Sequence, residues 1–212
     1  MKPTEILVLF PETATIGEEG QLVLGGCPVQ ELRRRFGTPL YVFDELTLRH
    51  RCRAFHAALE TYYPAPGQIA YASKAYLCLA LAQLFAEEGL SLDVVSGGEA
   101  FVAQAAGFPP ERVAFHGNNK ARSELEQALA WGIGRIVVDN LDELRLLGEI
   151  TAGRTEPVSV WLRLSPGIDA HTHVHIRTGL VDSKFGLPIV TGDAESALQY
   201  SLSLSGVRVV GV

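Results

Sequence analysis

One lysine is a candidate for covalent chemistry. Lys74 is the only charged residue between Thr61 and Ala86, and it lies between the apolar run Ile69–Ala72 and an apolar stretch that begins at Leu77. An ammonium group without a local partner is costly to desolvate, so an apolar environment favours the neutral amine. A neutral amine is a nucleophile, and with a carbonyl group it forms a Schiff base. A lysine that ends a strand and simply reaches solvent is the alternative interpretation.

Two other charged residues interrupt apolar runs. Asp93 is the lone acid in Leu92–Val95. A buried acid needs a partner, and Lys74 is the nearest plausible cation. The alternative interpretation is that Asp93 lies on a polar outer edge and is not buried. Arg163 shares one face of a predicted strand with Trp161 and Ser159. It is therefore expected to face the interior and hold an anion or an acid, with an ordinary interior ion pair as the alternative.

Two glycine-containing segments follow predicted strands. The segment His116–Lys120 reads His-Gly-Asn-Asn-Lys. A turn alone explains its glycine and asparagines, whereas a functional site better explains His116. The segment Ser96–Gly98 opens a predicted helix whose backbone N–H groups could hold an anion, although plain helix capping is the better interpretation.

Three histidines at alternate positions, His171, His173 and His175, would lie on one face of a strand and could bind zinc. Neither a cysteine nor a carboxylate is placed as an obvious fourth ligand, so we predict no metal site. The segment His171–Gly186 interrupts the pattern described next, which indicates a long loop of the kind that forms lids or interfaces.

The elements that must position these residues form a regular repeat. Anchors in five successive apolar runs are 23, 21, 22 and 23 residues apart. One strand, one helix and two short loops fill such a step, which is typical of parallel βα units. The even spacing, and the lack of Gly-x-Gly-x-x-Gly after a strand, favour a TIM (β/α)8-type barrel over a doubly wound open sheet. The seven predicted strands are Leu40–Phe43, Gln68–Ser73, Leu92–Val95, Arg112–Phe115, Arg135–Val138, Val158–Leu164 and Val207–Val212.

The strand count predicts an incomplete barrel. Seven of the eight strands of a barrel are present, and the sequence stops within the seventh. We therefore expect the front part of a longer protein. Residues 1–37 are predicted to be a lead-in with a short helix near Pro28–Phe36, associated with a second domain, and residues 38–212 the incomplete barrel.

Composition narrows the class of protein. The 212 residues are 47% hydrophobic, which excludes a disordered chain, and a net charge of −6 argues against a nucleic-acid binder. No run approaches the ~18 apolar residues of a membrane span, and Ile6–Phe10 is too short for a signal-peptide core. Cys27, Cys52 and Cys78 form neither a zinc spacing nor a disulfide framework. We expect a soluble, cytosolic protein.

Five segments taken together resemble a known family. They are Thr38–Asp44, Tyr71–Ala75, Asp93–Glu99, His116–Lys120, and the Thr-His, Thr-Gly and Ser-Lys-Phe-Gly motifs within His171–Gly186. In this order they resemble the diaminopimelate decarboxylases, pyridoxal-phosphate enzymes of the alanine-racemase-like barrel class. The first segments are shared with ornithine and arginine decarboxylases, and the last two are more specific to the diaminopimelate branch.

The resemblance implies roles for matching positions. Lys74 matches the lysine that forms a Schiff base with pyridoxal 5'-phosphate. Asp93 matches an acid near that lysine and the cofactor, and Arg163 an arginine under the cofactor ring that helps position the acid of the pyridine nitrogen. The other matching residues are placed only on the active-site face, with His116 also expected to bind cofactor: His116, Asn118, His173 and Ser183. Tyr76, where the class usually has asparagine, is a mild departure.

The resemblance also implies a reaction, the decarboxylation of meso-diaminopimelate to L-lysine and CO2. The family's phosphate-binding glycines, pyridine-nitrogen glutamate and C-terminal β domain follow the part that this chain matches. That domain supplies a cysteine and a tyrosine across a dimer interface, so a homodimer is expected for the full-length form and little activity for these residues alone. The alternatives are ornithine or arginine as substrate, a cofactor-free Schiff-base aldolase, and a non-enzymatic pyridoxal-phosphate-binding barrel.

Overall fold

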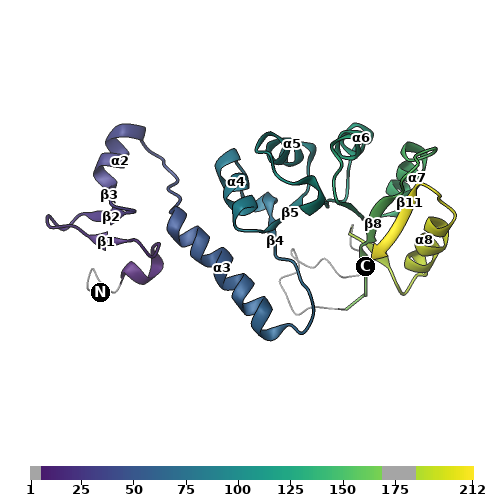
Figure 1. Ribbon diagram of the computed structural model, residues 1–212, viewed down its shortest axis with the longest axis horizontal. Coiled ribbons are helices and arrows are strands. Elements are labelled where there is room, and N and C mark those ends of the chain that lie inside the picture. Colours follow the sequence, from purple (N-terminus) through teal and green to yellow (C-terminus); the bar gives the residue numbers. More distant parts are fainter. Residues whose placement is uncertain (1–5, 169–184) are drawn as a thin grey trace. The chain divides into compact units, whose positions relative to one another are not determined.

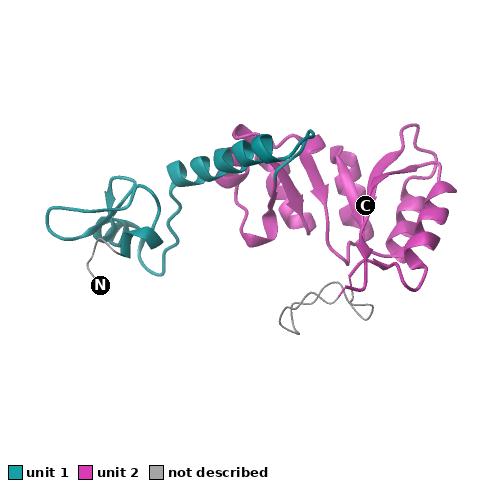
Figure 2. Cartoon of the chain, turned by 90° about the horizontal axis from the view of Figure 1, so that it is seen from below, with its two compact units in different colours: residues 1–69 teal, residues 70–212 magenta. Residues whose placement is uncertain are grey.

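The structure is a computed structural model that describes residues 6–168 and 185–212. Contacts divide the chain into two compact units, Met1–Ile69 and Ala70–Val212 (Figure 2). The predicted division at residue 37 concerns the domains of a longer protein and stays a prediction, because the units describe only how this chain packs. No described helix is both long enough and apolar enough to cross a membrane.

The first unit combines a small antiparallel sheet with helices. Its elements are η1 (Leu7–Leu9), β1 (Thr15–Ile16), β2 (Leu22–Leu24), β3 (Cys27–Pro28), α2 (Val29–Phe36) and α3 (Glu45–Tyr62). The three strands pair in chain order. The short helix predicted near Pro28–Phe36 is confirmed by α2.

A single carboxylate fixes the start of α3. Asp44 is the N-cap residue, and its Oδ1 accepts hydrogen bonds from the backbone N and the hydroxyl of Thr47 at 2.8 and 2.6 Å. Its Oδ2 accepts a hydrogen bond from the Thr13 hydroxyl at 2.6 Å. The hydrogen bonds from Thr13 and Thr47 favour the ionised form and lower the pKa of Asp44 below its ordinary value.

The first predicted strand, Leu40–Phe43, is wrong. The segment is not a strand, and its four side chains are exposed, Tyr41 by 90%. A strand requires a hydrogen-bonded neighbour as well as apolar residues, and the large sheet of the protein begins only at residue 70. The apolar composition of a short segment is therefore not enough to predict that it pairs with a neighbouring strand.

The second unit is built on six parallel strands. They are β4 (Ala70–Ala72), β5 (Ser91–Val94), β6 (Val113–Phe115), β7 (Arg135–Val138), β8 (Val158–Leu162) and β11 (Val207–Gly211). Their spatial order is the order in the chain, and every pair is parallel. A doubly wound sheet would reverse its order at a switch point. The unreversed order confirms the predicted incomplete βα barrel, with six of the seven predicted strands.

Helices accompany each step of the sheet. They are α4 (Leu79–Glu87), α5 (Gly97–Ala105), α6 (Arg122–Trp131), α7 (Leu141–Ile150) and α8 (Asp193–Leu202), with short turns η2 (Ser73–Ala75) and η3 (Pro110–Arg112). Each of these α-helices contacts the next, and Figure 1 shows them in succession along the outer side of the strands. A separate two-stranded parallel sheet joins β9 (Leu164–Ser165) to β10 (Leu187–Pro188).

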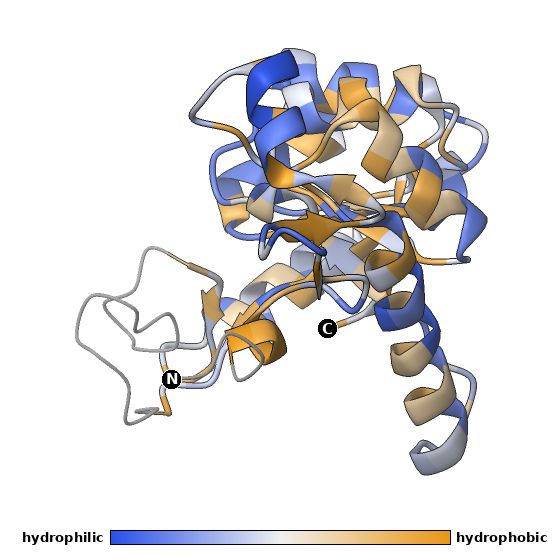
Figure 3. Ribbon diagram, turned by 90° about the vertical axis from the view of Figure 1, so that its left-hand side faces the viewer, coloured by the Kyte–Doolittle hydropathy of each residue, from blue (hydrophilic) through white to orange (hydrophobic). Residues whose placement is uncertain are grey.

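The core lies between the strands and this layer of helices, and apolar residues gather there (Figure 3). Along β8, Val158, Val160 and Leu162 are buried, whereas Ser159 and Trp161 are half-buried. Burying each large apolar side chain contributes about 1.5–3 kcal/mol. Arg163, the next residue, continues the half-buried face, as the alternation predicted.

Candidate active site

The residues predicted to carry chemistry gather at one edge of the sheet. Parallel strands place their carboxyl ends together, and the register aligns Ala72 of β4 with Asp93 of β5 and Val94 with Phe115 of β6. The edge therefore brings together residues from five successive strand ends: Lys74, Asp93, His116, Asp139 and Arg163.

Lys74 lies in η2, directly after β4. Its side chain is exposed, so the expectation that apolar neighbours would withhold the amine from water is wrong. The cause is topological, because β4 is an edge strand whose only sheet neighbour in the described chain is β5. Among residues 6–168 and 185–212, the ammonium group has no hydrogen-bond or ion-pair partner. The amine is thus accessible to a carbonyl-bearing ligand.

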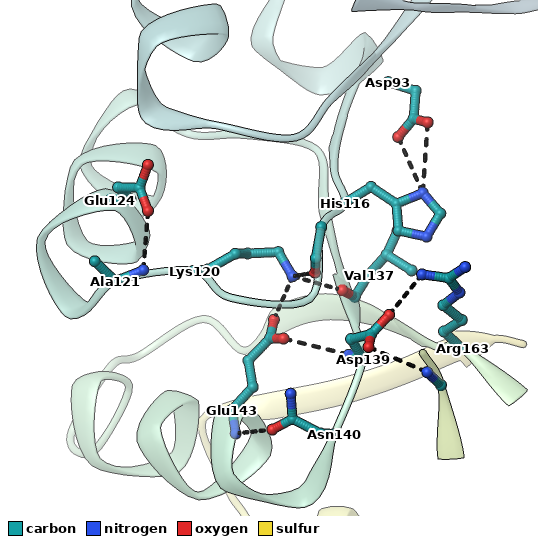
Figure 4. Close-up of polar contacts among 12 residues, drawn as sticks. Asp93, His116, Lys120, Ala121, Glu124, Val137, Asp139, Asn140, Glu143 and Arg163 are labelled. Atoms are coloured by element: carbon teal, nitrogen blue, oxygen red, sulfur yellow. Dashed lines mark hydrogen bonds and ion pairs between the residues drawn. The ribbon is translucent and has the colours of Figure 1, made fainter. Parts of the chain in front are cut away.

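Asp93 contacts His116 across two strands, as Figure 4 shows. The Nδ1 atom of His116 lies 3.3 Å from one carboxylate oxygen of Asp93 and 3.4 Å from the other. The partner predicted for Asp93 was Lys74, and this is wrong in the described residues. The side chain of His116 instead reaches back from the end of β6 toward the end of β5, and its backbone N–H donates to Val94 O at 2.7 Å.

Two buried polar atoms on either side of Asp93 have no hydrogen-bond partner in the described part of the protein. One is Nε2 of His116, and the other is Oγ of Ser73, a residue that is 2% exposed. Buried polar atoms in native proteins are nearly always satisfied, so each such atom calls for an explanation. A polar ligand held at this edge would supply one, and Lys74 directly follows Ser73 in the chain.

Arg163 takes part in an ion pair. Its Nη1 atom lies 2.7 Å from Oδ1 of Asp139, a residue at the end of β7 that is 1% exposed. The second carboxylate oxygen accepts a hydrogen bond from the backbone N–H of Gly186 at 3.1 Å. The guanidinium group also lies over the ring of Phe185, 4.6 Å from its centre. The ion-pair interpretation of Arg163 is confirmed.

Lys120 and Glu143 form a second charge pair that the sequence analysis missed. Nζ of Lys120 lies 2.7 Å from Oε1 of Glu143, and their side chains are 1% and 5% exposed. Burial lowers the pKa of Lys120 and raises that of Glu143, and the attraction between the two charges opposes both shifts. The available signal was a lysine shortly after a strand, with an acid in the first turn of the helix that follows the next strand.

The remaining predicted sites have mixed outcomes. The helix that follows Ser96 is capped, because Ser96 Oγ accepts from Glu99 N at 3.2 Å and Glu124 accepts from Gly97 N at 2.6 Å. The capping interpretation is therefore confirmed, and Glu124 occupies the position where an anion would bind. Asn118 is half-buried in the loop after β6.

The segment with the three histidines lies outside the described residues. The same is true of Ser183 and of the zinc alternative at His171, His173 and His175. Within residues 6–168 and 185–212, no group of three potential metal ligands is found. The prediction of no metal site stays a prediction.

Comparison with known proteins gives a consistent set of relatives. The family model described as "Pyridoxal-dependent decarboxylase, pyridoxal binding domain" matches residues 46–212. A diaminopimelate decarboxylase of Bacillus methanolicus is 49% identical over 96% of this chain and 47% of its own length. That of Bacillus subtilis is 46% identical over 94% and 45%. The chain thus spans about half the length of the curated relatives it matches.

Solved structures agree. Diaminopimelate decarboxylase from M. jannaschii, in complex with L-lysine, superimposes with a TM-score of 0.84 at 34% identity, covering 95% of this chain and 47% of that one. The Helicobacter pylori enzyme, also complexed with L-lysine, gives 0.75 at 31% identity, covering 86% and 45%. Because residues 46–212 of the present chain match the model of the family's pyridoxal binding domain, the chain belongs to the pyridoxal-dependent decarboxylases.

Proposed function

We propose that this chain forms the cofactor-anchoring part of a decarboxylase that converts meso-diaminopimelate to L-lysine and CO2. The observation that carries the proposal is the accessible amine of Lys74, at the same sheet edge as two buried polar atoms without partners, Ser73 Oγ and His116 Nε2. These features fit pyridoxal phosphate, which offers an aldehyde to an amine and several polar groups to hydrogen-bonding atoms. The relatives described above support the choice of substrate.

Each residue then has a role that its surroundings allow. Lys74 supplies the amine that bonds to the cofactor's aldehyde. Asp93 orients the ring of His116 through Nδ1, which leaves Nε2 directed away from Asp93, buried and without a hydrogen-bond partner in the described residues. The Asp139 carboxylate holds the Arg163 guanidinium in place. Bound pyridoxal phosphate would accept the electrons left on the substrate carbon when CO2 departs.

Two residues of the proposed site, His173 and Ser183, are carried over from the sequence motifs alone. Asn118 has the additional support of its place in the loop that bears His116. We also propose that the full-length protein is a cytoplasmic homodimer, for which the family resemblance is the only support. Sedimentation of the full-length protein would test the oligomeric state.

A labelling experiment tests the anchor. The chain contains four lysines, Lys2, Lys74, Lys120 and Lys184. Pyridoxal phosphate is added, the imine is reduced with borohydride, and the labelled peptide is identified by mass spectrometry. We expect label on Lys74, dependent on reduction and lost in Lys74→Ala but not in the control Lys2→Ala. Equal labelling of several lysines would contradict the assignment.

Substrate class needs a second measurement. The absorbance band of the cofactor-loaded chain is recorded with meso-diaminopimelate, ornithine or arginine added. A change at lower concentration with meso-diaminopimelate supports the proposed substrate, and the reverse order favours the alternative. Absence of any response to amines, with Lys74 labelled, would favour a non-enzymatic carrier. Failure of Lys74 to bind the cofactor would reopen the cofactor-free aldolase, which the family match disfavours.

A further inference from the structure

Lys120 is bonded through all three of its ammonium protons. Nζ donates to Gly117 O at 2.7 Å, to Val137 O at 2.9 Å and to Glu143 Oε1 at 2.7 Å. These acceptors belong to the loop after β6, to β7 and to α7. One side chain thus joins three elements (Figure 4), and the first of its acceptors, Gly117, directly follows His116 in the chain.

Glu143 extends the connection toward Arg163. Its Oε2 accepts a hydrogen bond from Asp139 N at 3.3 Å, and its own N–H donates to Asn140 Oδ1 at 2.9 Å. Asp139 in turn holds Arg163. A continuous series of hydrogen bonds therefore runs from the loop bearing His116, through Lys120 and Glu143, to the residue that pairs with Arg163.

Such a pair is a costly way to obtain stability. Desolvating two charges offsets much of their attraction, and well-packed apolar residues of similar volume often stabilise a protein equally well. What apolar residues cannot do is hold Gly117 O and Val137 O at fixed positions. The main contribution of the pair is therefore placement of the backbone at the sheet edge.

We propose that Lys120 is a positioning residue which, paired with Glu143, holds the loop of His116 and the Asp139–Arg163 pair in register for cofactor binding. The inference rests on the proposed function, because it assigns His116 and Arg163 to the cofactor site. Neither residue touches Lys120 directly in any described hydrogen bond, so its action is indirect.

The experiment separates stability from placement. In Lys120→Met, Glu143 is left buried and unpaired, so the thermal unfolding midpoint should fall strongly. In the double variant Lys120→Met/Glu143→Leu, both charges are removed and much of that loss should be regained. The ring NMR signals of His116, assigned with His116→Gln, should differ from wild type in both variants. Pyridoxal phosphate affinity should be roughly tenfold weaker or worse in both.

The matched control is Asp142→Asn, which breaks an exposed ion pair of the same helix, between Asp142 and Arg145 at 2.7 Å. It should alter neither the His116 signals nor the affinity. A double variant that regains both wild-type His116 signals and wild-type affinity would show a purely structural role and overturn the proposal. Failure of both variants to fold would also overturn it, because stability would then depend on the pair.

The two proposals fail differently. The His116 signals are recorded on the cofactor-free chain, so they test the positioning role independently of whether Lys74 binds the cofactor. Absence of cofactor on Lys74 of the wild-type chain would instead contradict the proposed function. Wild-type labelling together with unchanged His116 signals in the variants would remove only the positioning role.

Discussion

Asp139 holds Arg163 from the neighbouring strand end, with Oδ1 at 2.7 Å from the Nη1 of the guanidinium group. The carboxylate is almost completely buried, and its other oxygen is bound to the backbone N–H of Gly186. Both carboxylate oxygens are thus engaged, and the orientation of Arg163 is set by the residue that directly follows β7. An arginine at a strand end is by itself flexible, so this pair is what makes it a defined part of the sheet edge.

Replacing Asp139 with asparagine should destabilise the protein by about 2 kcal/mol, because a charge-assisted hydrogen bond is lost and Arg163 is left partly buried without its partner. The free energy of unfolding in urea is the measurement. Asp142→Asn, which removes an exposed carboxylate from a surface pair, should change it by less than about 1 kcal/mol. Equal effects of the two substitutions would contradict a special role for Asp139.

Local pattern predicted all six strands of the large sheet, together with one strand, Leu40–Phe43, that is absent. Leu92, Val113 and Val158 recur in short apolar runs at a nearly constant spacing, and each lies in a strand of the parallel sheet. The predicted cap at Ser96 is also present. These features depend on residues that are close together in the chain, so they can be predicted from a single sequence.

The partners of the charged residues could not be predicted in the same way. Asp93 contacts His116 rather than Lys74, because β6 as well as β4 flanks its strand and a spacing pattern does not distinguish the two sides. Exposure of Lys74 follows from the edge position of β4. The segment His116–Lys120 by itself indicates only a polar turn. The burial of Lys120 could not be predicted from it, because that burial depends on Glu143, which lies 23 residues away.

Acid should weaken the first unit through Asp44. The pKa of Asp44 is lowered in the folded state by the Thr13 and Thr47 hydrogen bonds. Its contribution to stability is therefore fully present above its ordinary pKa of about 4, and it is lost as the pH falls through the lowered folded-state value. Far-UV circular dichroism in urea at several pH values would measure this.

The substitution Asp44→Asn should reduce that acid dependence. Glu45→Gln is the control, because Glu45 is the next residue and its side chain, which pairs with Arg49, is 70% exposed. A pH dependence that is unchanged in Asp44→Asn would show that other carboxylates cause the acid sensitivity.

Gly117 holds the loop of His116 in a backbone conformation that excludes a side chain. Its φ is +97°, and a Cβ there would lie 2.9 Å from Val95 O. Gly117→Ala should cost about 1–3 kcal/mol in the free energy of unfolding through strain, with a further loss from this contact. Gly107→Ala is the matched control, since φ is +74° and no atom lies within 4 Å of the added Cβ.

The two variants together separate backbone strain from crowding. A larger loss of stability in Gly117→Ala, accompanied by changed His116 NMR signals, is the expected result. Equal losses, with unchanged His116 signals in both, would mean that the contact with Val95 O is relieved by a small shift of the chain.

The sheet itself predicts weak catalysis by residues 1–212 alone. In the described chain, β4 and β11 each have one sheet neighbour, so the strand end that bears Lys74 is open on one side. A group anchored there is free to move, and misplacement by about 1 Å can lower a rate about a hundredfold.

We therefore expect CO2 release from meso-diaminopimelate at least about a hundredfold slower than that of the Bacillus subtilis relative, measured side by side with pyridoxal phosphate in excess. Lys74→Ala sets the background of the assay. Turnover close to that of the relative would show that closure of the barrel is unnecessary for the chemistry, and the amine would then have to be held by groups at the sheet edge that already surround it.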